Sequence, residues 1–148
     1  MEDKIVAIGS DHAGFELKEK VKINLADLGY EIKDFGTDST DSVDYPLIAK
    51  SLATSVAAKN PSKGILVCGT GVGMAIAANK IKGIIAANCN DVVTAKLSRQ
   101  HNNSNILTLG GRMIGEDQAA DIVKTWLETD FEGGRHQRRI QEIRDLEK

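Results

Sequence analysis

A thiol lies where an apolar run of the sequence meets a glycine-rich turn. Cys68 ends the run GILVC, and the turn GTGVG follows at once, at residues 69–73. If the run is a strand and a helix follows, backbone N–H groups converge at the junction and the helix dipole favours negative charge there. The junction therefore predicts an anion site, in which the thiol can serve as a base and the N–H groups as an oxyanion hole.

The glycine spacing of this turn does not match the common nucleotide-binding loops. No Gly-Lys-Ser/Thr follows at the spacing of a Walker A loop. A dinucleotide-binding loop needs a small residue three positions after its second glycine, where the two possible registers place Met74 and Ile76. Both cofactor interpretations are therefore disfavoured, and we expect no bound NAD.

Further polar residues follow predicted strands or end a predicted helix: Asp11, His12, Thr70, His101, Asn102 and Arg112. Ligands of open parallel sheets bind beyond the carboxyl ends of the strands. We therefore expect these residues to converge with Cys68 on one edge, as a set suited to acid–base chemistry. Cys89 lacks a glycine-rich turn and is interpreted as a small buried residue. His136 is interpreted as a neighbour of a phosphate, not as a catalyst.

Strand-like and helix-like segments alternate along the chain. Predicted strands cover residues 4–9, 30–35, 65–68, 83–89 and 106–109, and predicted helices cover residues 15–28, 44–59, 74–80, 92–100 and 116–128. This alternation predicts a three-layer α/β fold around a five-stranded parallel sheet.

A separate tail, residues 135–148, follows two glycines. Three of its apolar residues fall on one helical face: Ile140, Ile143 and Leu146. Because such a stripe must be buried somewhere, we expect the tail to pack on a partner subunit. Arg135 and Arg139 are four residues apart, so their repulsion costs a few tenths of a kcal/mol in a helix. An anion bound between them would remove that cost; a solvated basic face is the alternative.

Composition narrows the class of protein. The 148 residues are 41% hydrophobic and 27% charged, which predicts a single globular domain over residues 1–148. A net charge of −2 and an aromatic content of 4% argue against binding to nucleic acid. We expect no membrane span and no secretory signal. Two cysteines without metal-ligand spacing indicate reduced thiols in the cytoplasm and no metal site.

Six motifs taken together resemble a known family: GSDHAG (9–14), DYP (44–46), CGTGVGM (68–74), IAANK (76–80), SRQHN (98–102) and EGGRH (132–136). In this order, and over essentially the whole chain, they are similar to the B-type ribose-5-phosphate isomerases. The galactose-6-phosphate isomerase subunits of the lactose pathway share that fold. Ala75 stands where many members have serine, so a hydrogen bond from that hydroxyl is missing here.

The resemblance implies a Rossmann-like fold and a reaction that needs neither a metal nor an organic cofactor. Ribose 5-phosphate and ribulose 5-phosphate would be interconverted through an enediolate, with Cys68 as the base and His101 as the acid–base group that opens the sugar ring. Thr70 would support the anion or relay a proton. The implied substrate-binding residues are Asp11, His12, Tyr45, Gly69, Gly71, Gly73, Asn102, Arg112, Arg135 and Arg139. His12 and the three arginines would hold the phosphate.

The resemblance also implies that two subunits build each site together, so we expect at least a homodimer, with a tetramer as the alternative. Three other functions stay open at this point. The substrate can be a hexose 6-phosphate, such as allose or galactose 6-phosphate. The chain can be a non-catalytic phosphosugar-binding domain. A nucleic-acid role for the arginines of the tail is the least favoured. The sequence also leaves open whether Cys68 or Thr70 reprotonates the enediolate.

Overall fold

The computed structural model describes residues 4–147. Residues 1–3 and Lys148, the last residue of the predicted tail, lie outside the described residues. The strands are β1 (Ile5–Ser10), β2 (Glu31–Asp34), β3 (Gly64–Cys68), β4 (Ala86–Asn88) and β5 (Ile106–Gly110). The helices are α1 (Phe15–Asp27), α2 (Tyr45–Ala57), α3 (Val72–Asn79), α4 (Val92–Gln100), α5 (Glu116–Glu128) and α6 (Arg135–Asp145). Each predicted strand and helix is confirmed.

All strand pairs of the sheet are parallel, in the order β2-β1-β3-β5-β4. Gly64, the first residue of β3, pairs with Ala7 and Ile106, and Cys68, its last residue, pairs with Gly110. The strands therefore share one carboxyl edge and one amino edge. Cys68 lies at the carboxyl edge of the central strand.

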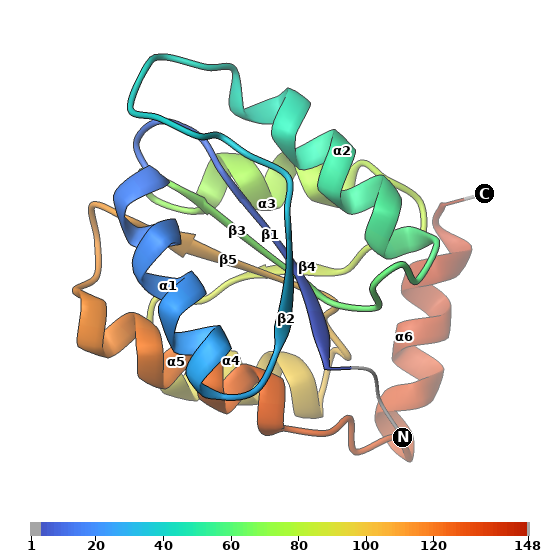
Figure 1. Ribbon diagram of the computed structural model, residues 1–148. Helices are drawn as coiled ribbons and strands as arrows, with labels where there is room; N and C mark the ends of the chain where they lie inside the picture. The colour runs from blue at the N-terminus through green and yellow to red at the C-terminus, as the bar shows by residue number, and fades with distance from the viewer. Residues whose placement is uncertain (1–3, 148) are drawn as a thin grey trace.

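Helices cover both faces of the sheet (Figure 1). Helices α2 and α3 pack on one face, and α1, α4 and α5 pack on the other, each over its own apolar cluster. Every residue of β3 and of β5 is buried. This explains why the sequences GILVC and ILTLG do not alternate between apolar and polar residues, because a strand covered on both faces has no solvent side.

Strand β4 is shorter than the predicted segment 83–89 and forms an edge of the sheet. Side chains bond the backbone beside it. The Asn79 side chain donates to the carbonyl of Ala86 at 3.0 Å and accepts from its N–H at 2.7 Å, and Asn105 accepts from Ile85 N–H at 2.8 Å. Because these amides take ladder bonds that another strand would make, pairing stops after a few residues.

Helix α6 stands apart from the layers of the sheet (Figure 1). Ile140 is buried in its own chain, whereas Ile143 is 42% and Leu146 is 82% exposed. Glu147 is tied to the body of the protein, because its carboxylate accepts from Gly83 N–H at 3.0 Å. The predicted apolar stripe is therefore only partly covered within this chain.

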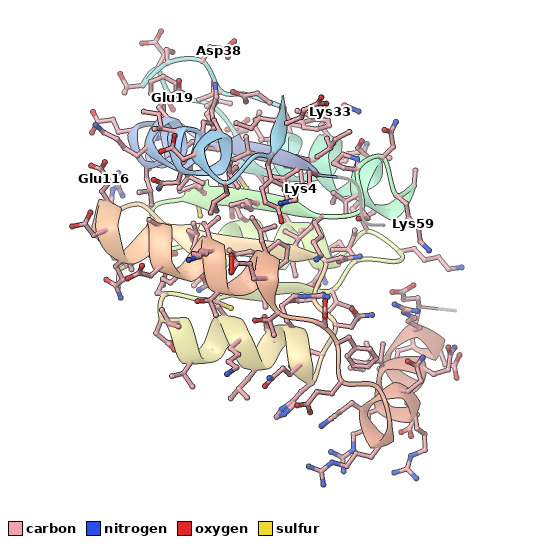
Figure 2. All side chains as sticks on the ribbon, turned by 60° about the horizontal axis from the view of Figure 1, so that its bottom comes forward. Lys4, Glu19, Lys33, Asp38, Lys59 and Glu116 are labelled. Carbon is pink, nitrogen blue, oxygen red and sulfur yellow. The ribbon has the colours of Figure 1, made fainter. Side chains whose placement is uncertain are left out.

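Charges of both signs lie around the outside of the protein. Figure 2 shows Glu19, Asp38 and Glu116 toward the left of the view, Lys33 and Lys59 toward the right, and Lys4 near the middle. Among the described residues, no helix is long and apolar enough to cross a membrane.

Candidate active site

Cys68 sits at the end of β3 with 5% of its surface exposed. The backbone N–H of Gly71 donates a hydrogen bond to its Sγ atom at 3.2 Å. Helix α3 starts one residue later, so its N-terminal dipole also points at this region. The predicted junction of strand, thiol and helix is therefore present, and its backbone is oriented to stabilise negative charge.

The glycines of the turn make room for protein atoms. Gly71 has φ = +86°, and a Cβ there would lie 2.3 Å from Asn88 Oδ1. At Gly73 a Cβ would lie 2.7 Å from the ring of Tyr45. A side chain at either position would force the turn or the tyrosine to move. The glycines thus let the α2 terminus, which begins with Tyr45, close against the turn.

A cavity of about 370 Å³ and one of about 320 Å³ lie at opposite edges of the sheet, and the smaller one contains the thiol. The smaller cavity is lined by Asp11, His12, Ala13, Tyr45, Cys68, Gly69, Thr70, Gly73 and Arg112. We call it the carboxyl-edge cavity. All of these except Ala13 were predicted as site residues from the sequence, and the structure brings them together. Gly71 adjoins the cavity through its bond to the sulfur.

Asp11 and His12 are held by backbone groups of the surrounding loops. Asp11 is buried, and its carboxylate accepts from Gly14 N–H at 3.0 Å. His12 Nδ1 accepts from Val43 N–H at 3.2 Å. Because Nδ1 is an acceptor, the Nε2 atom of a neutral His12 carries the ring proton and is a donor. The loop before α2 therefore sets the tautomer of this histidine.

Thr70 and Arg112 come from the turns after β3 and β5. Thr70 Oγ1 accepts from Val72 N–H at 3.2 Å, a local turn bond just before α3 that fixes the hydroxyl. Arg112 N–H donates to the carbonyl of Gly69 at 3.0 Å, so the two turns are bonded to each other. An arginine beside a thiol, a carboxylate and an imidazole provides a cationic group for a phosphorylated ligand.

His101 and Asn102 do not lie at this edge, so the prediction that all the polar groups converge on one edge is wrong within one chain. Helix α4 leaves the carboxyl end of β4 and runs back for nine residues, about 14 Å. It ends just before β5 begins, and there Asn105 N–H bonds the carbonyl of Ile85. His101, which directly follows the last residue of α4, therefore lies at the amino edge.

A second group of side chains surrounds His101 there. The rings of His101 and His136 stack, with centroids 4.3 Å apart and an interplanar angle of 15°. Glu132 Oε1 lies 3.9 Å from His101 Nε2 and 3.6 Å from His136 Nε2. We call these three residues the amino-edge cluster. Arg135 and Arg139 belong to the same helix as His136 and are exposed.

His136 is the buried member of this cluster. Burial lowers the pKa of His136, and the positive charges of His101, Arg135 and Arg139 lower it further, against the opposing effect of Glu132. The sequence interpretation placed His136 only as a neighbour of a phosphate and gave Glu132 no role. Their four-residue spacing was the available signal, but the two glycines between them hid it because they interrupt a helical pattern.

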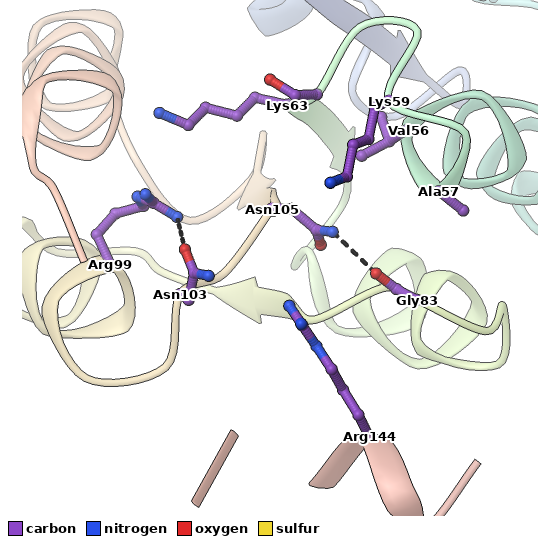
Figure 3. A pocket seen from close by; sticks show the side chains of 10 residues that line it. Val56, Ala57, Lys59, Lys63, Gly83, Arg99, Asn103, Asn105 and Arg144 are labelled. Atoms are coloured by element: carbon purple, nitrogen blue, oxygen red, sulfur yellow. Dashed lines mark hydrogen bonds between the residues drawn. The ribbon is translucent and has the colours of Figure 1, made fainter. Parts of the chain in front are cut away.

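The larger cavity, at the amino edge, contains no acid–base set (Figure 3). It is lined by Val56, Ala57, Lys59, Ser62, Lys63, Gly83, Arg99, Asn103, Asn105 and Arg144. Several of these groups bond to one another: Arg99 donates to Asn103 Oδ1 at 3.1 Å, and Asn105 donates to the Gly83 carbonyl at 3.0 Å. No cysteine, histidine or carboxylate is among the lining residues, so cavity size does not identify the chemical site.

Cys89 is the structural thiol that the sequence predicts. It is fully buried, and burial raises its pKa to about 11, with a further increase from the charge of Asp91. Such a thiol stays protonated at neutral pH and does not act as a base. Cys68 is therefore the cysteine placed for chemistry.

Comparisons with known proteins agree with this geometry. The sequence pattern of the ribose/galactose isomerase family matches residues 6–143. Ribose-5-phosphate isomerase B of Escherichia coli K12 is 46% identical, with 97% of each chain covered. A D-erythrulose-4-phosphate isomerase of Pectobacterium atrosepticum is 39% identical, with 93% of this chain and 91% of the relative covered.

A solved structure extends the agreement to three dimensions. Ribose-5-phosphate isomerase B of Clostridium thermocellum superposes with a TM-score of 0.95 at 48% identity, over 97% of each chain. The resemblance inferred from the six motifs and the Rossmann-like fold are thus confirmed. The chain belongs to the ribose/galactose isomerase family and is a sugar-phosphate isomerase.

Proposed function

We propose that this isomerase interconverts ribose 5-phosphate and ribulose 5-phosphate, with Cys68 as the base and without a metal or organic cofactor. One observation supports this most strongly. The Cys68 sulfur, with the Gly71 N–H bonded to it, adjoins the carboxyl-edge cavity together with a carboxylate, an imidazole and an arginine. The choice of ribose 5-phosphate as the substrate rests on the name of the E. coli relative, ribose-5-phosphate isomerase B.

The proposed step moves one proton between adjacent carbons. The Cys68 thiolate takes the proton from C2 of the open aldose, and the electron pair moves through C1 to the carbonyl oxygen, which gives an enediolate. Backbone N–H groups of the glycine turn stabilise this oxyanion. Return of a proton to C1, together with transfer of the O2 proton to the O1 oxyanion, gives the C2 carbonyl and the C1 hydroxymethyl group of the ketose. Cys68 or Thr70 performs the reprotonation, and both line the cavity.

His101 opens the ribose ring in this proposal, and it reaches the cavity from a second copy of the chain. Its position at the amino edge supports a shared site, because within one chain α4, about 14 Å long, carries it from the carboxyl edge, where Cys68 lies, to the opposite edge of the sheet. A two-fold dimer brings the amino edge of each copy to the carboxyl edge of the other and forms two equivalent sites. Asn102, Arg135 and Arg139 would arrive with His101, and the phosphate would then be held by His12 and arginines of both copies.

Exposed apolar side chains support the dimer. Val72 and Ile76 lie on one face of α3, and Val93 and Leu97 lie on one face of α4. These two helices flank β4, the edge strand of the sheet, from opposite faces. Apolar patches of this kind mark protein interfaces. The partly exposed stripe of α6 is a second surface for the partner subunit, while a tetramer needs a further contact.

The test of the base is exchange of the substrate C2 proton in deuterated water. Cys68→Ala is expected to lose exchange and turnover by about 10²–10⁴-fold, while calorimetry still detects binding of the sugar phosphate. Cys89→Ala is the matched control, since it removes the other thiol and leaves the cavity intact. Exchange at the wild-type rate in Cys68→Ala would remove Cys68 from the role of base.

The preferred sugar is tested by kcat/KM for ribose 5-phosphate, allose 6-phosphate, galactose 6-phosphate and erythrose 4-phosphate. We expect ribose 5-phosphate to give the highest value. A higher value for a hexose phosphate would establish the alternative substrate. Binding without turnover of any of them would indicate a phosphosugar-binding domain.

A further inference from the structure

The amino-edge cluster brings together the donor atoms of a metal site. The ligand atoms of His101, Glu132 and His136 all lie within 4.8 Å of one another, and both Nε2 atoms face the same carboxylate oxygen. Two imidazoles with one carboxylate are a common protein donor set for Zn²⁺, with open positions left for water. The sequence does not connect His101 with Glu132 and His136, because His101 meets them only where the end of α4 lies against the start of α6.

We propose that His101, Glu132 and His136 bind a divalent transition-metal ion such as Zn²⁺, and that the bound ion inhibits the isomerase by occupying His101. The inhibitory part rests on the proposed function, in which His101 opens the sugar ring. The binding part rests only on the geometry of the cluster.

Closing the cluster around an ion needs a turn of the His101 ring and a small shift of Glu132. An imidazole binds a metal in the plane of its own ring, so the stacked rings of His101 and His136 must open, and the His101 ring, which is 39% exposed, is free of close packing on its outer side. Bonds of 2.0–2.1 Å in a tetrahedral site place two ligand atoms about 3.3 Å apart. The contacts of Glu132, 3.9 Å to His101 and 3.6 Å to His136, exceed this by less than about 1 Å. Glu132 is half exposed and precedes two glycines in positive-φ conformations, so its carboxylate can shift without disturbing the core.

The charge around the cluster predicts weak and reversible binding. Arg135 and Arg139 stand on the same helix as His136 and oppose a doubly charged cation, while Glu132 is the only carboxylate in the set. A structural zinc site instead has four protein ligands and no open position. The expected site is therefore one that is occupied when free metal rises and emptied by a chelator.

Metal binding changes the chemistry that His101 can perform. A coordinated Nε2 has its lone pair bound to the ion, so the imidazole can no longer accept a proton from a sugar hydroxyl through that atom. Zn²⁺ is therefore expected to inhibit turnover of ribose 5-phosphate. It should spare erythrose 4-phosphate, whose O4 carries the phosphate and cannot close a furanose ring.

Calorimetric titration with Zn²⁺ tests the site directly, in a Cys68→Ala background that removes the competing reactive thiol. Glu132→Ala in this background is expected to weaken binding by about tenfold or more. Glu142→Ala is the matched control, because Glu142 is an exposed carboxylate of α6 that lies 3.5 Å from Arg138 instead. Equal affinity with and without Glu132, or no binding at all, would overturn the site.

Inhibition is measured separately in the protein with Cys68 intact. Zn²⁺ should inhibit ribose 5-phosphate turnover by wild type and by Glu142→Ala, with recovery after a chelator is added. Glu132→Ala should need about tenfold more Zn²⁺. Inhibition unchanged by Glu132→Ala would place the inhibitory ion at Cys68 and overturn the inhibitory part. If calorimetry detects the site but wild type turns over no sugar phosphate, the proposed function fails while the metal site stands.

Discussion

The carboxyl-edge cavity and the amino-edge cluster differ in how their side chains are held. Cys68 and Asp11 are buried, and backbone N–H groups bond both of them. His101 and Glu132 are substantially exposed, and they meet on a helix end and a loop. The first region keeps a reactive group in a fixed place next to its donors. The second presents acid–base and cationic groups outward, as a surface that completes a neighbouring site would.

The largest expected contrast between the two regions comes from His101→Asn. If His101 only opens the ring, this variant loses about 10²-fold in kcat/KM for ribose 5-phosphate. It should retain near wild-type activity with erythrose 4-phosphate, which reacts without ring opening. Steady-state assays with both sugars measure the contrast. Equal losses on the two substrates would place His101 in the proton transfer between C2 and C1. They would contradict the assignment of ring opening to the amino edge and of proton transfer to the carboxyl edge.

A smaller effect separates the arginines of the two regions. Arg112→Gln at the carboxyl edge and Arg135→Gln at the amino edge should each raise KM about tenfold with little change in kcat, because each removes a charged hydrogen bond to the phosphate. Arg138→Gln, on the exposed side of α6 beside Glu142, is the control and should leave KM unchanged. An unchanged KM in Arg135→Gln would show that Arg135, in the tail, does not bind the phosphate.

The smallest effect on catalysis is expected from Asp34, which serves stability. Lys18 is 1% exposed, and its Nζ lies 2.9 Å from each carboxylate oxygen of Asp34. Burial raises the pKa of Asp34, but hydrogen bonds from Lys22, Lys18 and Gly36 N–H outweigh it, so the pKa is lowered overall. A lowered folded-state pKa gives stability that is present above the unfolded value, about 3.9, and lost as pH falls through the folded value.

Asp34→Asn should therefore cost about 3 kcal/mol at pH 7, because it removes both 2.9 Å carboxylate contacts of the buried Lys18 ammonium and leaves the exposed carboxylate of Glu19, 3.5 Å away. The difference from wild type should shrink as the pH falls below about 4, since wild type then loses the same charge. Urea unfolding at several pH values measures this. Glu19→Gln is the control, because this exposed carboxylate lies farther from the same lysines, 3.5 Å from Lys18 and 3.3 Å from Lys22, and its expected cost is below about 1 kcal/mol. A pH-independent difference would contradict the ionic origin.

The sequence was sufficient for the elements and for the carboxyl-edge residues. Cys68 ends a buried strand, and His12 and Arg112 each follow one by two residues. Because parallel strands end together, the meeting of these residues is a consequence of topology. His101 was misplaced because the rule was applied to the end of a helix. A helix that returns from one strand to the next ends at the opposite edge of the sheet.

The sequence patterns could not predict contacts between elements that lie far apart in the chain. The order of β4 and β5 in the sheet depends on how α3, α4 and α5 cover its two faces, and no local spacing encodes that choice. The stacking of His101 on His136 needs α6 to reach the end of α4. Glu132 therefore had no visible partner in the sequence.

Complementation between two inactive variants tests the shared site most directly. Cys68→Ala damages only the carboxyl edge, and His101→Asn damages only the amino edge. Random reassociation of equal amounts makes half of the dimers mixed, and each mixed dimer has one intact site of two, so about a quarter of wild-type activity on ribose 5-phosphate should return. If mixed dimers form and activity does not return, the two regions do not combine across subunits, and the account is contradicted.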